Sequence, residues 1–337
     1  MRRIRIAQIG LNRYSHASEV FETLKLHPEI FDIAGFALVE DERETCQAKL
    51  KCFDGYPELT LEQILRDPTI EAVTVETDEI HLNQYAQLAA EAGKHIHMEK
   101  PGSQCLEGFE KLISTMRQTG RVFHLGYMYR YNPVIADAIR RAKAGEFGHI
   151  YSVEAHMSRY DAKPTREWFG SFRGGMMFYL GCHLVDLVMQ LQGEPQEVIP
   201  LNTATGIDGV NTEDLGFAVL RYPHATSVIR MGGTEIAGFE RRQLVICGEK
   251  RTVEIRPLEA IVENAERPYM LRTEKTEACI GEDGLVVKTH SRSEDFGRYE
   301  DMLLSFAAMV RGEQENPCGL DYELSLFRVL MQCCGIK

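Results

Sequence analysis

The segment Gly93-Lys94-His95-Ile96-His97-Met98-Glu99-Lys100-Pro101 indicates the fold of this chain more clearly than any other. A helix-like run rich in Ala, Leu and Gln, residues 82–92, precedes it, and its first glycine stands where a helix C-terminal glycine belongs. Ile96-His97-Met98 fits a short buried strand, which the proline ends because it cannot donate to a strand ladder. Lys100 is therefore expected at the carboxyl end of a strand, the edge at which open α/β sheets bind ligands.

Composition limits the class of protein. The 337 residues are enough for two domains that each bury a core, and 44% hydrophobic with 26% charged residues is typical of a globular protein. The formal net charge of −12, without a Lys/Arg-rich tract, argues against a nucleic-acid partner. No apolar run reaches the roughly 20 residues of a membrane helix. The nine cysteines show no C-x-x-C spacing, so a reducing cytoplasm is the expected compartment.

Strand and helix patterns alternate through the first third of the chain. This rhythm predicts an α/β Rossmann domain with a doubly wound parallel sheet over residues 1–125. Residues 126–337 are expected to form an α+β domain with a large, mostly antiparallel open sheet, whose C-terminal helix is free to pack back on the first domain. Its predicted strands are 150–157, 198–205, 212–222, 226–235, 242–248, 251–256 and 284–289, and its last helices are 295–311 and 322–334.

The turn after the first strand reads Gly10-Leu11-Asn12-Arg13-Tyr14-Ser15, where a dinucleotide fingerprint would read G-x-G-x-x-G. Only the first glycine is present, although Asn tolerates positive φ and Ser is small. The alternative interpretation of this segment is a structural turn that binds no ligand. Glu40, at the end of the second strand, can accept a hydrogen bond from a ribose hydroxyl and would repel a ribose phosphate. NAD(H) is therefore favoured over NADP(H), although Arg13 and Arg43 argue for the opposite preference. A solvated strand end is the alternative for Glu40 and Asp41.

A second informative block begins at Gly174-Gly175 and continues into an apolar helix. Spacings of four and three are expected to place Tyr179, His183 and Asp186 on one side of that helix. Histidine titrates near neutral pH and an aspartate can orient or charge it, so this face can relay a proton. The alternative is that His183 has a structural role and no part in catalysis.

Glu99-Lys100-Pro101 together with Gly181-x-His183-x-x-Asp186 resembles the Gfo/Idh/MocA oxidoreductases, the glucose–fructose oxidoreductase and inositol dehydrogenase family. Arg130-Tyr131-Asn132-Pro133 and Gly145-Glu146-Phe147-Gly148 fit the same pattern in the same order, so the resemblance covers essentially the whole chain. It implies a Rossmann domain that binds NAD(P) and a second domain that forms a homodimer or homotetramer through its sheet.

The resemblance also implies roles for single residues. Lys100 would contact the nicotinamide ribose and the substrate hydroxyl, and His183 would exchange a proton with the carbinol oxygen. Two departures stand out. The family often has an aspartate where this chain has Tyr179, and its T-P-x-x-x-H segment appears here as Glu76-Thr77-Asp78-Glu79-Ile80-His81, without the proline.

The expected activity is hydride transfer between a nicotinamide and a secondary alcohol or ketone of a sugar, cyclitol or related polyol. No metal site is predicted, because no Cys, His or carboxylate spacing matches one. The expected catalytic residues are Lys100, His183, Tyr179 and Asp186; the cofactor residues are Gly10, Leu11, Asn12, Arg13, Tyr14, Glu40, Thr77, His81, Glu99 and Lys100; the substrate residues are Arg130, Tyr127, Trp168 and His183. A buried ion pair is the alternative for Arg130, and core packing is the alternative for Trp168.

Two other functions fit the same motifs. Some family members cleave glycosides with tightly held NAD and no net redox change. Others bind a nucleotide or sugar as non-catalytic sensors. The asparagine at position 12 and the tyrosine at position 179 favour the sensor, whereas Lys100 and His183 oppose it.

Overall fold

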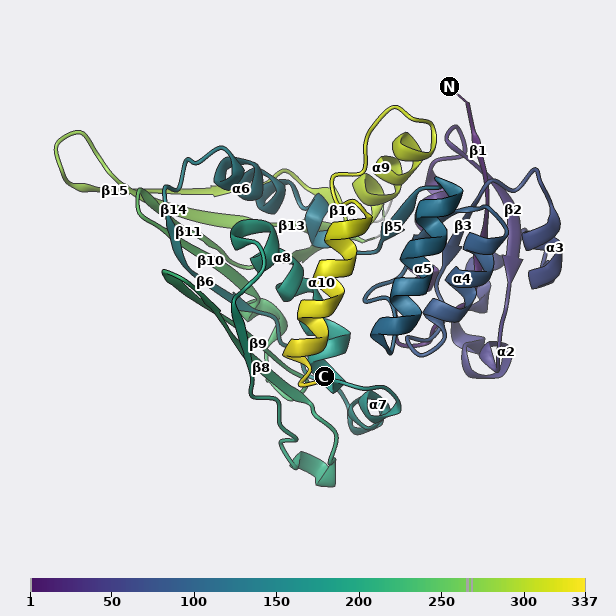
Figure 1. Cartoon of the computed structure of the whole chain (residues 1–337), viewed down its shortest axis with the longest axis horizontal. Coiled ribbons are helices and arrows are strands. Elements are labelled where there is room, and N and C mark those ends of the chain that lie inside the picture. The colour runs from purple at the N-terminus through teal and green to yellow at the C-terminus, as the bar shows by residue number, and fades with distance from the viewer. Residues whose placement is uncertain (1, 265–266, 268, 337) are drawn as a thin grey trace. The chain divides into compact units, whose positions relative to one another are not determined.

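The computed structural model describes residues 2–264, 267 and 269–336 and divides into two compact units (Figure 1). Unit 1 comprises Met1–Tyr127 and Tyr299–Leu324, and unit 2 comprises Met128–Arg298 and Ser325–Lys337. The predicted helix 295–311, assigned from sequence to the second domain, is observed as α9 (Glu300–Val310) and groups with unit 1.

Unit 1 is built on a five-stranded sheet in the order β2-β1-β3-β4-β5, with every neighbouring pair parallel. This confirms the predicted parallel sheet. Because the order reverses beside β1, the carboxyl ends of β1 and β3 form the switch point at which such sheets bind ligands. The strands are β1 (Ile4–Ile9), β2 (Phe31–Ala37), β3 (Ala72–Val75), β4 (His95–Met98) and β5 (Phe123–Leu125).

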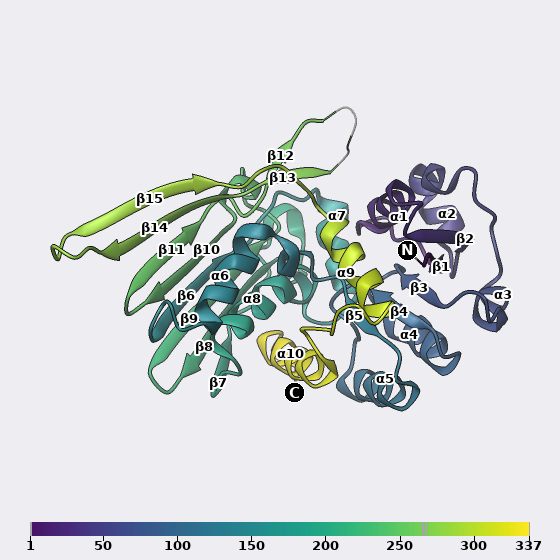
Figure 2. The same ribbon diagram turned by 90° about the horizontal axis from the view of Figure 1, so that it is seen from above.

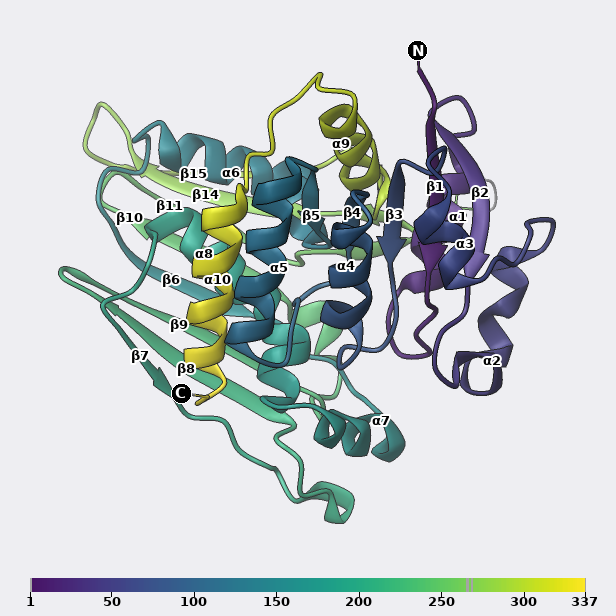
Figure 3. The same ribbon diagram turned by 45° about the vertical axis from the view of Figure 1, so that its right-hand side comes forward.

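Helices cover both faces of this sheet, with α4 and α5 on one face and α1 on the other (Figure 2). The four residues of β3 are all buried, as expected for a strand covered on both sides. The same α4 and α5 are seen side by side in Figure 3. Besides α9, the helices of unit 1 are α1 (Ala17–Leu26), α2 (Glu42–Thr45), α3 (Leu61–Arg66), α4 (Leu82–Glu91) and α5 (Leu106–Thr119), with a 3₁₀ segment at Gln47–Phe53.

Unit 2 contains an eight-stranded sheet in the order β15-β14-β11-β10-β6-β9-β8-β7, antiparallel except for the pair β6 and β9. The predicted mostly antiparallel sheet is confirmed. A small sheet of β12, β13 and β16 and the strand β14 were not predicted. The large sheet comprises β6 (Ile150–His156), β7 (Glu197–Pro200), β8 (Leu215–Tyr222), β9 (Ala225–Gly232), β10 (Gln243–Gly248), β11 (Arg251–Ile255), β14 (Glu274–Ile280) and β15 (Val286–Arg292); the small one comprises β12 (Ala260–Val262), β13 (Met270–Arg272) and β16 (Phe296–Gly297).

Two helices, α6 (Pro133–Lys143) and α8 (Cys182–Gln192), pack against one face of the large sheet. A π-helical turn, Met177–Gly181, leads into α8. The predicted α-helical spacing therefore holds for His183 and Asp186 but not for Tyr179, which lies on the wider π turn. Turns of this kind are frequent at functional sites. The remaining helices are α7 (Lys163–Trp168) and α10 (Leu320–Cys333).

Candidate active site

The Glu99-Lys100 pair follows β4 directly, at the carboxyl edge of the parallel sheet. Both side chains are only 8% exposed, and the Lys100 Nζ lies 3.4 Å from a carboxylate oxygen of Glu99. A buried ammonium is stabilised by such a carboxylate, which also holds it in place. The sheet thus presents a fixed cation at the edge where the sequence placed it.

The glycine turn packs directly on the segment after β3. Gly10 has φ +91°, and a Cβ there would lie 2.8 Å from the backbone nitrogen of Thr77, so only glycine fits. The Asn12 Nδ2 donates to an oxygen of Glu79 at 2.8 Å, while its Oδ1 accepts from the Tyr14 N–H. The switch point is therefore bridged by side chains of the two segments that border it.

A lysine that sequence reasoning missed supports the same turn. The Lys49 Nζ donates to the carbonyl oxygens of Asn12 at 3.0 Å and Ser15 at 2.6 Å. Burial lowers the pKa of Lys49. A close-packed glycine, a cation on the turn and the start of α1 immediately after it fit an anionic dinucleotide. Lys49 lies in a 3₁₀ segment after α2, and no local sequence pattern marks it.

Three carboxylates, Glu40, Asp41 and Glu42, follow β2, and the structure places Glu40 and Glu42 against different partners. Glu40 has φ +50° and accepts a hydrogen bond from the Tyr85 hydroxyl at 2.6 Å, with a His81 ring nitrogen 3.8 Å away. Glu42 instead accepts from the Thr77 hydroxyl at 2.6 Å and from the backbone N–H groups of Val39 and Leu11. Burial raises the pKa of Glu42 to about 7. Glu42, which the sequence analysis missed, is thus the carboxylate on the glycine turn.

The other predicted residues of unit 1 are placed as follows. The guanidinium of Arg13 lies over the Tyr14 ring at 4.5 Å from its centroid. Tyr127, predicted as a substrate residue, is 1% exposed at the end of unit 1.

In unit 2, His183 lies in the first turn of α8 against a residue that was not predicted. The Tyr129 ring packs edge-on against the imidazole, with centroids 5.2 Å apart and an interplanar angle of 84°. The Tyr129 hydroxyl donates to fully buried Glu259 at 2.6 Å, and that carboxylate also pairs with Arg242 and Arg298. Tyr129 and Glu259 are distant in sequence, so only the fold brings them together.

Asp186 is engaged by Arg130, which was predicted as a substrate residue. The Arg130 Nη2 donates to Asp186 at 2.8 Å and its Nε at 3.0 Å, in a two-pronged ion pair whose side chains are 5% and 1% exposed. Gln190 donates to the same carboxylate at 3.2 Å. This arrangement ties the segment before α6 to α8.

Tyr179 and Trp168 lie in one aromatic cluster. Their rings pack edge-on, 5.1 Å apart at 85°, and Phe169 and Phe172 join them. Trp168 is 8% and Tyr179 4% exposed. The cluster fixes the π turn before His183 because each ring contacts at least two others.

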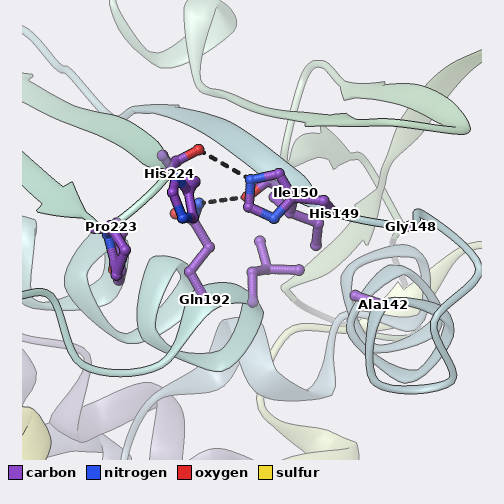
Figure 4. A pocket seen from close by; sticks show the side chains of 10 residues that line it. Ala142, Gly148, His149, Ile150, Gln192, Pro223 and His224 are labelled. Atoms are coloured by element: carbon purple, nitrogen blue, oxygen red, sulfur yellow. Dashed lines mark hydrogen bonds between the residues drawn. The ribbon is translucent and has the colours of Figure 1, made fainter.

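Figure 4 shows a separate cavity of about 360 Å³ beside the other end of α8. His149 lines it and bonds through Nε2 to the backbone oxygen of His224, and Gln192 donates to the Ile150 carbonyl. Gln192 is the last residue of α8, whereas His183 lies in its first turn. This cavity is therefore distinct from the surroundings of His183.

The described residues contain neither a metal-binding cluster nor a membrane-spanning helix. In that part of the chain, no group of three or more His, Cys, Asp or Glu side chains is arranged to hold a metal ion. Among the same residues, every helix is too short or too polar to cross a membrane.

Known proteins with the same pattern identify the family. Residues 4–127 match the oxidoreductase family with an NAD-binding Rossmann fold, and residues 135–254 match the Gfo/Idh/MocA C-terminal domain. The chain belongs to the Gfo/Idh/MocA oxidoreductase family. The resemblance inferred from the E-K-P and H-x-x-D motifs is thereby confirmed.

Several relatives are named for their activities. The chain is 32% identical over 131 residues to the NAD(+)-dependent scyllo-inositol 2-dehydrogenase of Bacillus subtilis, covering 39% of this chain and 38% of the relative. It is 23% identical over 245 residues to the NADP(+)-dependent scyllo-inositol 2-dehydrogenase IolW of the same species, covering 72% and 67%. An aldose-aldose oxidoreductase from Caulobacter crescentus, solved with glycerol, shares the fold with a TM-score of 0.79, 19% identity and coverage of 98% and 96%.

Proposed function

We propose that this family member transfers a hydride between a nicotinamide dinucleotide and a secondary alcohol or ketone of a sugar, cyclitol or related polyol. The observation that carries the proposal is the buried Lys100 ammonium at the carboxyl edge of an NAD-binding sheet. The two inositol dehydrogenases among its relatives support a polyhydroxylated substrate.

The chain's own residues supply the groups that this chemistry needs. A bound nicotinamide accepts or donates the hydride. Lys100 stabilises the negative charge that develops on the carbinol oxygen, and His183 removes or returns the proton of that oxygen. Tyr179 offers a hydroxyl where relatives often offer a carboxylate, and the Arg130–Asp186 pair holds α8, and with it His183, in place.

NAD(H) is the preferred cofactor in this proposal, supported by the carboxylates after β2. Glu42 lies on the glycine turn, and an ionised carboxylate there repels the extra phosphate of NADP. We expect E42Q to narrow the preference for NADH over NADPH more than E40Q does, measured as the ratio of dissociation constants by fluorescence titration. An equal or greater effect of E40Q would show that Glu40 sets the cofactor preference, as the sequence suggested.

Self-association through the large sheet completes the proposal. In β8 and β10, buried residues alternate with partly exposed ones, and Phe217, Val219 and Val245 belong to the second set. A homodimer or homotetramer would cover this face, and sedimentation velocity tests it. The nine free cysteines support a reducing, cytoplasmic location.

A cofactor and substrate screen tests the activity. We expect NADH to raise the melting temperature of the purified protein, because a ligand that binds only the folded state stabilises it. A panel of cyclitols, aldoses and other polyols with NAD⁺ should then give nicotinamide reduction for at least one compound. Glycoside cleavage without net reduction would identify the glycosidase alternative, and cofactor binding without any turnover would favour a sensor.

A further inference from the structure

We propose that Glu79 positions the dinucleotide-binding turn through Asn12, and that it must carry a proton when the anionic cofactor binds. This inference rests on the proposed cofactor. It concerns a residue that the sequence analysis placed only within a segment departing from the family pattern.

The geometry places Glu79 at the most crowded point of the turn. Asn12 stands where the fingerprint has its second glycine, the position at which backbone approaches a diphosphate. Its side chain reaches across the switch point to one carboxyl oxygen of Glu79 at 2.8 Å and toward the Thr77 carbonyl at 3.4 Å. Glu79 is 1% exposed, so its carboxyl group belongs to the interior of the turn.

The second oxygen of Glu79 makes this group unusual. Oε1 is buried and has no hydrogen-bond partner among the described residues. A buried carboxylate oxygen without a donor is costly when it is ionised, whereas a protonated carboxyl group offers a hydrogen there instead of a charge.

The charged groups around Glu79 are mostly negative. Asp78 lies in its own loop and Glu99 follows β4, while Glu76, at the end of β3, also interacts with it. Two ammonium groups oppose them, Lys100 after β4 and Lys49 in the 3₁₀ segment. Glu42 reaches the same segment through the Thr77 hydroxyl. Burial, the largest cause, raises the pKa of Glu79 to about 8.

Binding of a diphosphate beside this turn is therefore linked to a proton. At pH 7 the Glu79 carboxyl group is mostly neutral and does not repel the ligand. Above its pKa it ionises, and binding then requires that a proton be taken up from solution. Because one proton is linked, the affinity falls by up to about tenfold per pH unit above about pH 8 and is nearly constant below it.

The neighbouring buried glutamates are less suited to this role. Glu42 accepts hydrogen bonds from the Thr77 hydroxyl and the Val39 N–H, so its ionised form is compensated locally. Glu76 is fully buried, and the charged groups that act on it include Glu99, Lys100 and Glu79, with the His97 ring 3.7 Å away. Among the described residues, Asn12 donates a hydrogen bond to Glu79 and to neither Glu42 nor Glu76.

The test measures the dissociation constant of NADH from pH 6.5 to 9.5 by fluorescence, and proton uptake by calorimetry in two buffers of different ionisation enthalpy. For the natural protein we expect a rising dissociation constant and uptake of up to one proton above pH 8. E79Q keeps a neutral hydrogen-bond partner for Asn12. This variant should therefore bind NADH at pH 7 as tightly as the natural protein, and lose both the pH dependence of the dissociation constant and the proton uptake. E62Q, which changes an exposed carboxylate in α3 that is not among the groups around Glu79, is the control and should retain the natural profile.

A second variant separates positioning from folding. E79A leaves Asn12 without its partner, so we expect at least about tenfold weaker NADH binding at pH 7, restored by Gln at the same position. An unchanged pH profile in E79Q, or full affinity in E79A, overturns the proposal. If the folded natural protein binds neither NADH nor NADPH at any pH, the proposed cofactor function itself fails. That result is distinct from binding without a pH dependence.

Discussion

The ring of Tyr129 packs edge-on against the imidazole of His183. Its hydroxyl is held by Glu259, a fully buried carboxylate that also pairs with two arginines. Burial raises the pKa of Tyr129, so the hydroxyl stays protonated and donates at all ordinary pH values. The core of unit 2 therefore fixes the Tyr129 ring, against which the imidazole of His183, the proposed acid/base group, packs.

Removing this support should impair catalysis without affecting the cofactor. We expect Y129A to lower kcat/KM by roughly 10-fold to 100-fold, because a displaced catalytic group loses its alignment. The dissociation constant of NADH should not change, and the pH profile of kcat should shift because the surroundings of His183 become more solvated. Y129F keeps the ring and serves as the control, with activity within a few-fold of the natural protein. A Y129A enzyme with full activity and an unchanged pH profile would contradict this role.

The Arg130–Asp186 pair should dominate the stability of the α8 region. D186A leaves a buried guanidinium without its counter-charge, which costs about 3–5 kcal/mol of unfolding free energy. The matched control is D321A, which breaks the exposed Arg117–Asp321 pair and should cost at most about 1 kcal/mol. Urea denaturation measures the unfolding free energy of both variants. Similar losses in the two would show that the buried pair contributes no more to stability than the exposed pair.

Sequence patterns predicted the elements whose signal is local. The apolar run at β4 and the glycine before it placed Lys100 at a sheet edge, and the structure agrees. Residues that act through long-range packing gave no such signal. Lys49, Glu42 and Glu259 are ordinary charged residues in the sequence, and only the fold brings them to the glycine turn or to Tyr129.

The second strand shows why a local rule was insufficient. Glu40 is the first carboxylate after the strand, but its left-handed backbone directs it to Tyr85, and Glu42 two residues later contacts the turn. The π turn at Met177–Gly181 is a similar case, because a helical spacing rule assumes an unbroken α-helix.

A buried histidine pair in unit 1 should make the protein sensitive to acid. The His97 and His124 Nδ1 atoms are 2.8 Å apart, and burial lowers the pKa of His97 to about 3. In the unfolded chain His97 is protonated below about pH 6.5, whereas in the native protein it stays neutral until about pH 3. The free energy of unfolding therefore decreases as the pH falls through this range.

The variant H97Q removes this titration. Its unfolding free energy should fall less steeply between pH 6.5 and 4, by up to about 1.4 kcal/mol per pH unit relative to the natural protein. The exposed His290, replaced in H290Q, is the control and should leave the slope unchanged. Identical slopes for H97Q and the natural protein would show that His97 is protonated in the native state.

We propose above all that Lys100 and His183 act on one carbinol of a nicotinamide-dependent reaction. Single-turnover reduction of NAD⁺ by the best polyol of the screen, followed at 340 nm with K100M and H183Q, tests it most directly. We expect both variants to bind NADH and to reduce the cofactor at least about 100-fold more slowly than the natural enzyme. Reduction at the natural rate by either variant would contradict the account.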